Sequence, residues 1–368
     1  MKKLRIAQIA PLAERVPPKK YGGTERVVYT LTEGLVKKGH QVTLFASGDS
    51  KTNAKLISVY PRNLREAGIE DVYGTNNHNL LNFGLAYSKS DEFDLIHDHL
   101  APLSLPTANN FKGKSIMTMH GAFDVSNQSV FATLNNPHIV TISHSQYLLA
   151  PRQIHHIGTV YNGLNMDYYP FGEKANNYLL FMGRISKEKG AHHAIEVAQY
   201  LNIPLILAGK VDQYDKAYFE QTIAPKLSNR IKWIGEVAEK ERNRLYAKAL
   251  CLLHPVTWPE PFGLAMIEAM ACGCPVIAFN LGSIPEIVAH SKTGFVVSTT
   301  LEMSKAVKNI KQINRLECRK YSLENFSGER MVDNYEKIYY QIVNQNNVKK
   351  LSDSLASPLI LTGNQQIN

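Results

Sequence analysis

The amino-acid sequence predicts an α/β protein made of two Rossmann-like domains that face each other across a central cleft. Short apolar runs alternate with helical patterns along most of the chain, which is typical of parallel sheets with helices on both faces. The alternation stops at a polar stretch, 167–177, and then begins again. A length of 368 residues with 44% hydrophobic content is enough for two cores. Open α/β sheets bind ligands at the carboxyl ends of their strands, so two such sheets in tandem predict a ligand cleft between them.

In the first half of the chain, an apolar run at 4–10 ends at Pro11 and predicts the first strand. A helix is predicted at 22–38, because apolar residues recur there at helical spacing and Gly39 follows. Further short buried strands are expected at 41–46, 94–97, 115–119, 139–142 and 158–161. These elements assign residues 1–165 to an N-terminal Rossmann-like domain.

In the second half, strands are predicted at 178–182, 204–208, 231–234, 250–254 and 276–279. Helical patterns lie between them, so residues 166–325 form a second Rossmann-like domain. A last amphipathic helix with tyrosines at 335, 339 and 340 is expected at 326–345. Residues 346–368 have no clear periodicity and are predicted to be a disordered tail.

The net charge of +9 is spread along the chain without a dense basic run. No basic helix, zinc pattern or RNP-like motif accompanies it, so nucleic-acid binding is not expected. The charge fits attraction to anionic ligands or to an anionic membrane surface, or simply a solvated basic surface. No apolar run approaches the roughly 18–20 residues that span a bilayer. We expect a cytoplasmic protein whose membrane contact, where it has any, is peripheral and at the inner face.

The strongest chemical pattern lies at 258–278. Pro261 and Gly263 discourage a helix from starting early, so Glu260 is expected in the loop before a helix at 263–271. The first backbone N–H groups of that helix, at Phe262, Gly263 and Leu264, have no intrahelical partner. Such a helix end is suited to anions and sugar oxygens.

Glu268 lies inside the same helix among apolar neighbours. A carboxylate in so apolar a setting is costly without a partner. A ribose diol, which donates two hydrogen bonds to one carboxylate, would satisfy it, and so would a buried cap or salt bridge. The residues alone leave both interpretations open.

Arg184 and Lys189 follow the first strand of the second domain and precede a helix. The planar guanidinium fork and the ammonium point charge make a suitable pair for a diphosphate. An exposed basic loop is the alternative.

Two further candidates come from the first domain. Gly22 and Gly23 precede its first helix, where backbone N–H groups can approach a phosphate, although a plain turn would look the same. His120 ends an apolar strand and is expected to face the cleft, unless it is a structural histidine.

Two competing motifs are rejected. Residues 108–115 fit a relaxed Walker A pattern, but that pattern requires strand, loop and helix, and Ser115 instead begins a strand. His97, Asp98 and His99 are metal-ligand types. In a strand, however, the two histidines share one face and the aspartate lies on the other, without an apparent third ligand. A strand end is favoured, and no metal or other cofactor is predicted.

Taken together, these residues resemble family 4 of the retaining glycosyltransferases, of bacterial type, which have the GT-B fold. Glu260 and Glu268 match the E-x7-E signature of that family. The other matches occur in the family's order, over roughly residues 4–345: 21–25, 120–121, 160–163, 183–184, 189–190, 282–286 and 293–296.

The resemblance implies roles for the matched residues. Arg184 and Lys189 would bind the donor diphosphate, Glu268 the ribose, and the loop from Glu260 to Leu264 the donor sugar. The glycine loop would meet the phosphate or the acceptor, and His120 would lie near the sugar. The first domain would be the acceptor domain and the second the donor domain, with the helix at 326–345 crossing back onto the first.

The implied function is transfer of a hexose, with retention, from a nucleotide sugar such as UDP-glucose or GDP-mannose. The acceptor is a small molecule, lipid or polysaccharide, and its loops are expected at 60–82 and 121–136. The alternatives are a GT-B nucleotide-sugar epimerase and a non-catalytic sugar-nucleotide-binding protein of the same fold.

Overall fold

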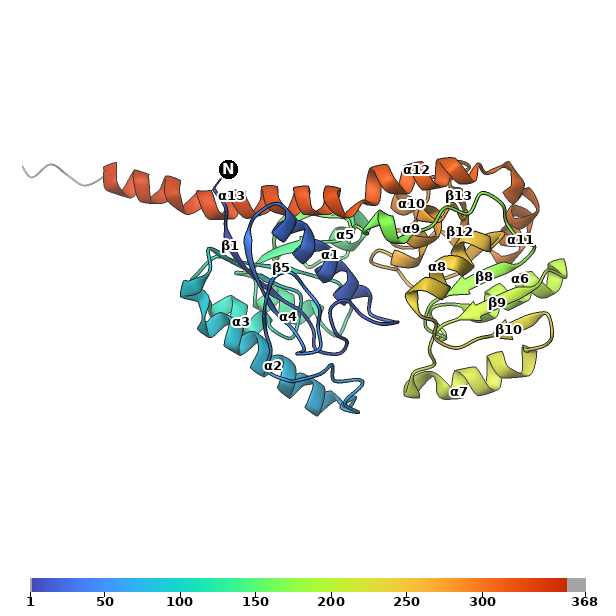
Figure 1. Ribbon diagram of the computed structural model, residues 1–368, viewed down its shortest axis with the longest axis horizontal. Coiled ribbons are helices and arrows are strands. Elements are labelled where there is room, and N and C mark those ends of the chain that lie inside the picture. The colour runs from blue at the N-terminus through green and yellow to red at the C-terminus, as the bar shows by residue number, and fades with distance from the viewer. Residues whose placement is uncertain (1, 356–368) are drawn as a thin grey trace, which may run out of the picture.

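The computed structural model describes residues 2–355 and contains two parallel β-sheets, each flanked by helices, that lie side by side (Figure 1). The first sheet has seven strands in the order β3-β2-β1-β4-β5-β6-β7, and the second has six in the order β10-β9-β8-β11-β12-β13. All pairings within them are parallel. The predicted fold class, α/β with two Rossmann-like domains, is therefore confirmed.

The strands of the first sheet are β1 (Arg5–Ile9), β2 (Gln41–Phe45), β3 (Lys55–Ile57), β4 (Leu95–Asp98), β5 (Ser115–Thr118), β6 (His138–Thr141) and β7 (His155–Thr159). Those of the second are β8 (Leu179–Met182), β9 (Leu205–Ala208), β10 (Ile231–Trp233), β11 (Cys251–His254), β12 (Val276–Phe279) and β13 (Gly294–Val297). The predicted boundary at residue 165 falls between the two sets.

The helices of the first half are α1 (Gly23–Lys37), α2 (Val72–Ser88), α3 (Leu105–Asn110), α4 (Gln128–Thr133) and α5 (His144–Leu148). Those of the second half are α6 (Ala191–Leu201), α7 (Lys216–Tyr218), α8 (Glu239–Lys248), α9 (Leu264–Ala271), α10 (Ile284–Ile287), α11 (Thr300–Asn309), α12 (Arg315–Phe326) and α13 (Gly328–Leu355).

Each domain has its own apolar core because its central strands are buried on both faces. Strands β8, β11 and β12 are buried along their whole length, as are β4 and β5 in the first domain. Near-continuous apolar runs are what such doubly covered parallel strands require. This is why the short runs in the sequence marked these strands well.

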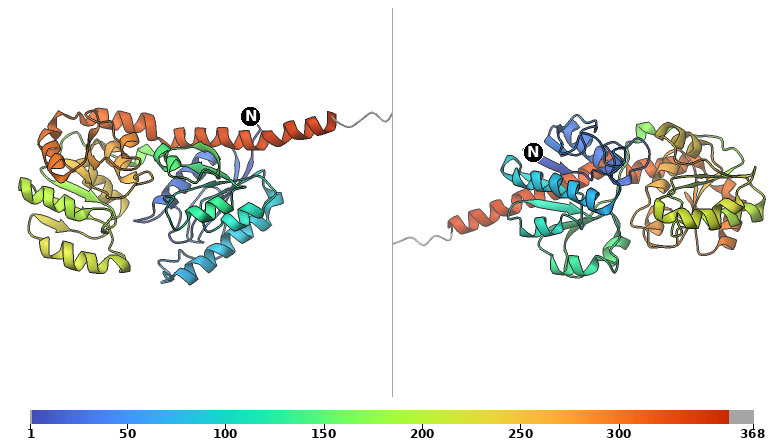
Figure 2. Two further views of the ribbon diagram at one scale, coloured as in Figure 1. Left: turned by 180° about the vertical axis from the view of Figure 1, so that it is seen from behind. Right: turned by 90° about the horizontal axis from the view of Figure 1, so that it is seen from below.

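Helix α13 connects the end of the chain to the first domain. It leaves α12, which packs on α9 in the second domain, and runs along the first domain, as the views from behind and below agree (Figure 2). Lys38 Nζ lies 2.6 Å from Glu336 Oε2, and the Tyr339 hydroxyl lies 2.6 Å from His97 Nδ1 in the first sheet. The core of the first domain therefore includes residues from the far end of the sequence.

The structure corrects several sequence-based boundaries. Strand β7 begins at His155, three residues before the predicted run at 158. The prediction missed its first residues because the strand is only partly buried and carries a weak apolar pattern. The region 60–82, expected as a loop, includes the N-terminal part of α2. The region 121–136, also expected as a loop, contains α4. The pattern also misses the edge strands β3 and β13, which are short and partly exposed.

The predicted tail also differs from the structure. Helix α13 continues to Leu355, past the predicted end at 345, because no glycine or proline interrupts residues 346–355. The remainder of the predicted tail, 356–368, lies outside the described residues. Within residues 2–355, no helix combines the length and apolar character that a membrane span requires.

Candidate functional site

The carboxyl ends of the two sheets meet at a cleft of about 580 Å³. Its volume is within the range of small-molecule sites. Residues of both domains line it, and the cleft brings together all ten residues selected from the sequence: Gly22, Gly23, His120, Arg184, Lys189, Glu260, Phe262, Gly263, Leu264 and Glu268. Their common location is an observation, whereas the roles assigned to them remain predictions.

Helix α9 opens toward the cleft with free backbone donors. Gly263, its N-cap, has φ +84°, a left-handed conformation that favours glycine, and no side chain caps the helix. The N–H groups of Phe262, Gly263 and Leu264 donate to no acceptor among the described residues. Ser283 fixes the preceding loop by donating through its hydroxyl to the Phe262 carbonyl at 2.9 Å. The result is a rigid, electropositive helix end that can hold anionic or hydroxyl oxygens.

Glu260 is buried beside that helix end and is paired with Lys189. Its Oε2 accepts from Lys189 Nζ at 2.6 Å and from Trp258 Nε1 at 3.0 Å. Burial works to raise the pKa of the Glu260 carboxyl, but Lys189, with His254 and Trp258, outweighs it and the net pKa is lowered. Glu260 is therefore ionised at neutral pH and holds the Lys189 ammonium in the cleft.

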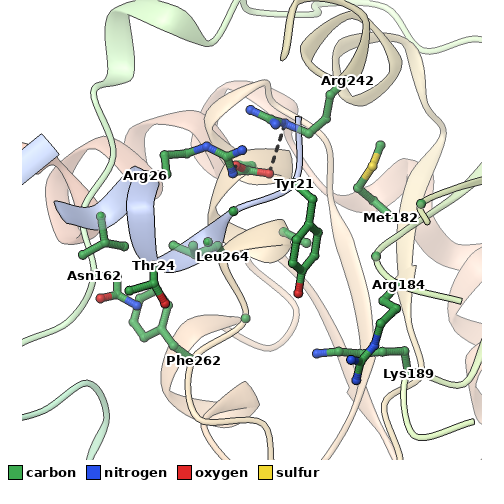
Figure 3. A pocket seen from close by; sticks show the side chains of 18 of the residues that line it. Tyr21, Thr24, Arg26, Asn162, Met182, Arg184, Lys189, Arg242, Phe262 and Leu264 are labelled. Atoms are coloured by element: carbon green, nitrogen blue, oxygen red, sulfur yellow. Dashed lines mark hydrogen bonds and ion pairs between the residues drawn. The ribbon is translucent and has the colours of Figure 1, made fainter. Parts of the chain in front are cut away.

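Arg184 extends from the end of β8 toward the same place. Its guanidinium contacts Glu188 at 2.5 Å and Asp212 at 3.4 Å, while about a third of the side chain stays exposed. Figure 3 shows the guanidinium beside the Lys189 side chain, with the hydroxyl of Tyr21 directed toward them. Arg184 and Lys189, the two cations that sequence analysis paired, are thus neighbours.

Glu268 is buried and already has protein partners. Its Oε1 accepts from Arg26 Nη1 at 2.7 Å and from the Tyr169 hydroxyl at 3.2 Å. Its Oε2 accepts from the Tyr246 hydroxyl at 3.1 Å and lies 3.5 Å from Arg242 Nε. The salt bridge that the sequence left open is therefore present. A ribose diol at Glu268 has to exchange with at least one of these donors.

The glycine loop reaches across the cleft to the second domain. Gly22 has φ +139°, and a Cβ there would lie 2.6 Å from Pro18 Cβ, so only glycine fits without a shift. A Cβ on Gly23 would lie 3.3 Å from Leu264 Cδ1, which shows how closely the loop approaches α9. The N–H of Tyr21 donates to Glu236 Oε1 at 2.9 Å. The two predicted ligand loops, one from each domain, therefore face each other.

His120 follows β5 and faces the cleft with part of its ring. Burial lowers its pKa to about 4, so the imidazole is neutral at physiological pH. Its Nε2 lies 2.9 Å from Nδ1 of His99. His97 and His99 share one side of β4, with ring centroids 4.0 Å apart, whereas Asp98 contacts Tyr87 on the other side. The predicted division of faces is confirmed.

The rejected motifs have structural explanations. Residues 108–115 form the end of helix α3, a loop and the start of β5, the reverse of the order a Walker A motif needs. Among the side chains that the structure describes, no three histidine, cysteine or carboxylate groups are placed together as metal ligands.

Sequence reasoning missed several residues that line the cleft. Arg26 and Arg242 are among them. The buried Nε of Arg26 has no hydrogen-bond partner among the described residues, and Arg242 Nε has only the longer ion-pair contact with Glu268. His254, at the end of β11, likewise has an unpaired buried Nε2, and burial lowers its pKa to about 4. Arg242 belongs to the polar helix α8, where a solvated face is the natural interpretation, so only its partner Glu268 offered a signal. Unpaired buried donors of this kind mark a site that a ligand completes.

Comparisons with known proteins agree with this geometry. A family model described as Glycosyltransferase Family 4 matches residues 21–168, and one described as Glycosyl transferases group 1 matches residues 171–326. The chain is 25% identical to the N-acetyl-alpha-D-glucosaminyl L-malate synthase of Bacillus anthracis, covering 88% of this chain and 94% of that protein.

Solved structures of the same fold extend over nearly the whole chain. Sucrose-phosphate synthase from Thermosynechococcus elongatus superposes with a TM-score of 0.75 at 19% identity, covering 96% of this chain and all of that one. Anabaena HepE, crystallised in complex with UDP-glucose, gives a TM-score of 0.68 at 18% identity, over 94% and 100% of the two chains. These likenesses confirm the expected GT-B arrangement of the two domains.

Proposed function

We propose, from the premise that this chain is a glycosyltransferase of the GT-B type, that it moves a hexose from a nucleotide sugar to an acceptor with retention at the anomeric carbon. The observation that carries the proposal is the pair of cations, Arg184 and Lys189, beside the open N-terminus of α9. Positive charge next to free backbone donors suits a sugar diphosphate, whose leaving group gains negative charge as the glycosidic bond breaks.

The second domain, 166–325, is proposed to hold the donor. Arg184 and Lys189 bind the diphosphate, and the N–H groups from Phe262 to Leu264 bind sugar hydroxyls. Glu268 receives the ribose diol after one of its present partners moves away. The complex of HepE with UDP-glucose supports a nucleotide sugar as the donor class. We favour UDP-sugars slightly over GDP-mannose.

The first domain, 1–165, is proposed to present the acceptor, a small molecule, lipid or polysaccharide, near His120 and the glycine loop. Transfer then proceeds on one face of the sugar. The bond from the anomeric carbon to the phosphate oxygen breaks, the acceptor oxygen bonds to the same carbon, and its proton passes to the departing phosphate. The neutral His120 and the backbone stabilise the oxocarbenium-like state.

A double displacement would need a carboxylate nucleophile under the anomeric carbon. Glu260 is a poor candidate because Oε2 accepts two hydrogen bonds, from Lys189 and Trp258. We therefore assign Glu260 to holding Lys189 and the ring's edge. Intact-protein mass spectrometry with a fluorinated donor tests this assignment, since a stable glycosyl adduct on Glu260 would contradict it.

The function as a whole is tested with a panel of UDP- and GDP-sugars. Binding is measured first as thermal stabilisation, which amounts to about 2.7 kcal/mol for a ligand at about 100 times its Kd. The stabilising donor is then followed by proton NMR. Release of the nucleoside diphosphate with an α-linked product from an α-linked donor is the expected result. A β-linked product contradicts retention, and C2 epimerisation of the donor without transfer indicates an epimerase.

A further inference from the structure

A chain of buried polar side chains runs from His120 through the first domain to helix α13. His120 Nε2 lies 2.9 Å from His99 Nδ1, and His99 Nε2 lies 2.8 Å from Gln8 Oε1. Gln8 Nε2 in turn donates to the Tyr339 hydroxyl at 3.0 Å. We call His120, His99, Gln8 and Tyr339 the buried relay.

The relay continues beyond Tyr339. The Tyr339 hydroxyl lies 2.6 Å from His97 Nδ1, and His97 Nε2 lies 2.7 Å from Thr118 Oγ1. Thr118 Oγ1 lies 2.9 Å from the hydroxyl of Tyr335, which like Tyr339 belongs to α13. Gln8, Tyr339 and His97 are fully buried, and His99 is only 3% exposed. Without water to compensate, each of these groups depends on the others for its hydrogen bonds.

The position of every proton in the relay follows from the amide of Gln8. Its carbonyl oxygen can only accept, so His99 Nε2 must carry a hydrogen. Burial keeps His99 neutral, because it lowers the pKa well below the usual value, so Nδ1 of the same ring is a bare acceptor. The hydrogen shared between His99 and His120 must then sit on Nε2 of His120. A neutral imidazole carries one hydrogen, and therefore Nδ1 of His120 has a free lone pair.

On the other side of Gln8 the same logic holds. The amide nitrogen can only donate, so Tyr339 accepts from it and turns its own hydrogen toward His97 Nδ1. In this arrangement the Tyr339 hydroxyl accepts from the Gln8 amide nitrogen and donates to His97 Nδ1. An amide flipped by half a turn would reverse the direction of every hydrogen bond along the relay.

We propose that Gln8, held by Tyr339 of helix α13, is a positioning residue that locks His120 in the tautomer with hydrogen on Nε2 and a bare Nδ1. Nδ1 of His120 has no hydrogen-bond partner among the described residues, and His120 lines the cleft. The consequence for chemistry rests on the proposed function. A bare Nδ1 accepts a hydrogen bond from a hydroxyl of the bound sugar or acceptor, and its lone pair favours developing positive charge. The opposite tautomer would present a donor there instead.

The tautomer is read directly by ¹⁵N NMR of protein labelled with ¹⁵N-histidine, because bare and protonated imidazole nitrogens resonate far apart. His120→Asn identifies the His120 signals by their loss. We expect a protonated Nε2 and a bare Nδ1 for His120 in the unliganded protein. A protonated Nδ1 at His120 overturns the proposal.

Two tyrosines on the same helix provide a matched pair of variants. Tyr339→Phe and Tyr335→Phe each remove one buried hydroxyl from α13, but only Tyr339 contacts Gln8. Tyr339→Phe frees the Gln8 amide to turn, so the two His120 tautomers mix and the nitrogen signals move together. Tyr335→Phe leaves the His120 signals in place. Equal behaviour of the two variants contradicts the assignment to Gln8.

A variant of Gln8 tests the relay at its centre. Gln8→Leu removes the acceptor of His99 and lets the His120 tautomer mix. With the donor found above, Tyr339→Phe and Gln8→Leu are expected to lower kcat about tenfold at unchanged donor KM, equivalent to one lost hydrogen bond. Tyr335→Phe stays near the wild-type kcat, because Tyr335 does not contact Gln8.

The NMR and kinetic experiments test the role of Gln8 and the proposed function independently. The expected tautomer in a protein that transfers no sugar refutes the proposed function and leaves the role of Gln8 intact. Sugar transfer by a protein with hydrogen on His120 Nδ1 refutes the role of Gln8 and leaves the function intact.

Discussion

Lys189 carries a positive charge that is held at the cleft by a single carboxylate. Its ammonium lies 2.6 Å from Glu260 Oε2 and 5.1 Å from the centre of the Trp258 ring. A leaving diphosphate would gain a second strong partner there, and removing a charge that stabilises a transition state costs about 2.7–4 kcal/mol. Lys189→Ala is therefore expected to lower kcat by two to three orders of magnitude, roughly, with an unchanged circular dichroism spectrum.

Lys187→Ala is the matched control, since Lys187 is exposed in the same loop and does not line the cleft. It should keep wild-type turnover. In the proposed mechanism the protein's own cations supply the electrostatic stabilisation, so turnover should also persist in excess chelator. Full turnover of Lys189→Ala, or abolition of activity by chelator, would remove the assignment of Lys189 to the leaving group.

Glu25 is a buried carboxyl in the first turn of α1, only 5% exposed. Burial, with a contribution from Glu14, raises its pKa from 4.5 to about 7. The raised pKa means that folding favours the protonated form, so the contribution to stability is full below about pH 4.5 and is lost as pH rises through about 7. Glu25→Gln should therefore leave Tm almost unchanged at pH 4.5 and raise it at pH 8. The corresponding gain in the free energy of unfolding at pH 8 is up to about 3 kcal/mol.

Differential scanning calorimetry across this pH range measures the effect, with Glu70→Gln, at an exposed glutamate, as the control for charge alone. A gain that is the same at both pH values would show that Glu25 is not the titrating group.

At the scale of single residues, the sequence predicted where the cleft residues lie better than it predicted which side chains contact each other. Short apolar strands and the glycine positions were enough to bring Arg184, Lys189 and Glu260 to one place. The partners of Glu268 were beyond reach, because Arg26 lies 242 positions away and Arg242 looks like any charged residue of a polar helix. The Arg26 contact depends on how the two domains meet and the Arg242 contact on how α8 packs on α9, and local patterns encode neither.

Helix α9 is the element that the sequence defined most closely. The predicted span, 263–271, agrees with the observed Leu264–Ala271 and its N-cap at Gly263, because proline and glycine punctuate both sides of an apolar run. Helix α2 was missed, since its run of asparagines and glycines gives a weak amphipathic pattern. The partly buried edge strands were missed for the same reason, because a strand that is incompletely buried has fewer apolar residues at regular spacing.

The N-cap of α9 gives a prediction at the scale of the element. An alanine at Gly263 would have to adopt φ +84°, and its Cβ would lie 2.6 Å from Met266 Cε and 3.5 Å from Glu260 Cγ. The backbone conformation costs about 1–2 kcal/mol, and relief of the contacts would turn the free N–H groups away from the cleft. Gly263→Ala is expected to lower kcat at least about tenfold with a small drop in Tm, since that corresponds to losing one or more hydrogen bonds to the sugar.

Gly68→Ala is the control for backbone strain alone, because Gly68 has φ +75° with nothing within 4 Å of the added Cβ. It should show a comparable Tm drop and normal turnover. Equal loss of turnover in the two variants would mean that the α9 end has no special role.

At the scale of the whole molecule, ion pairs join the two domains on either side of the cleft. Arg26 of the first domain contacts Glu268 of the second at 2.7 Å, and Arg65 contacts Glu236 at 3.0 Å. Near the connection between the domains, Glu286 accepts from the N–H groups of His144 and Ser145. The two walls of the cleft are therefore linked by ion pairs, one of which uses Glu268, the residue proposed to bind the ribose.

Arg26 consequently competes with the proposed ribose for Glu268. Arg26 Nη1 lies 2.7 Å from Glu268 Oε1, and this pair is nearly dry, with the side chains 13% and 3% exposed. Arg26→Ala removes the competitor, while Arg242 and the two tyrosines still offset the buried charge. We expect this variant to bind UDP or the preferred nucleoside diphosphate several-fold more tightly by isothermal titration calorimetry, although its Tm falls.

Arg65→Ala breaks the other inter-domain pair without freeing Glu268, so it should lower Tm and leave nucleotide affinity unchanged. Weaker nucleotide binding in Arg26→Ala than in Arg65→Ala would show that Arg26 belongs to the binding site and does not block it.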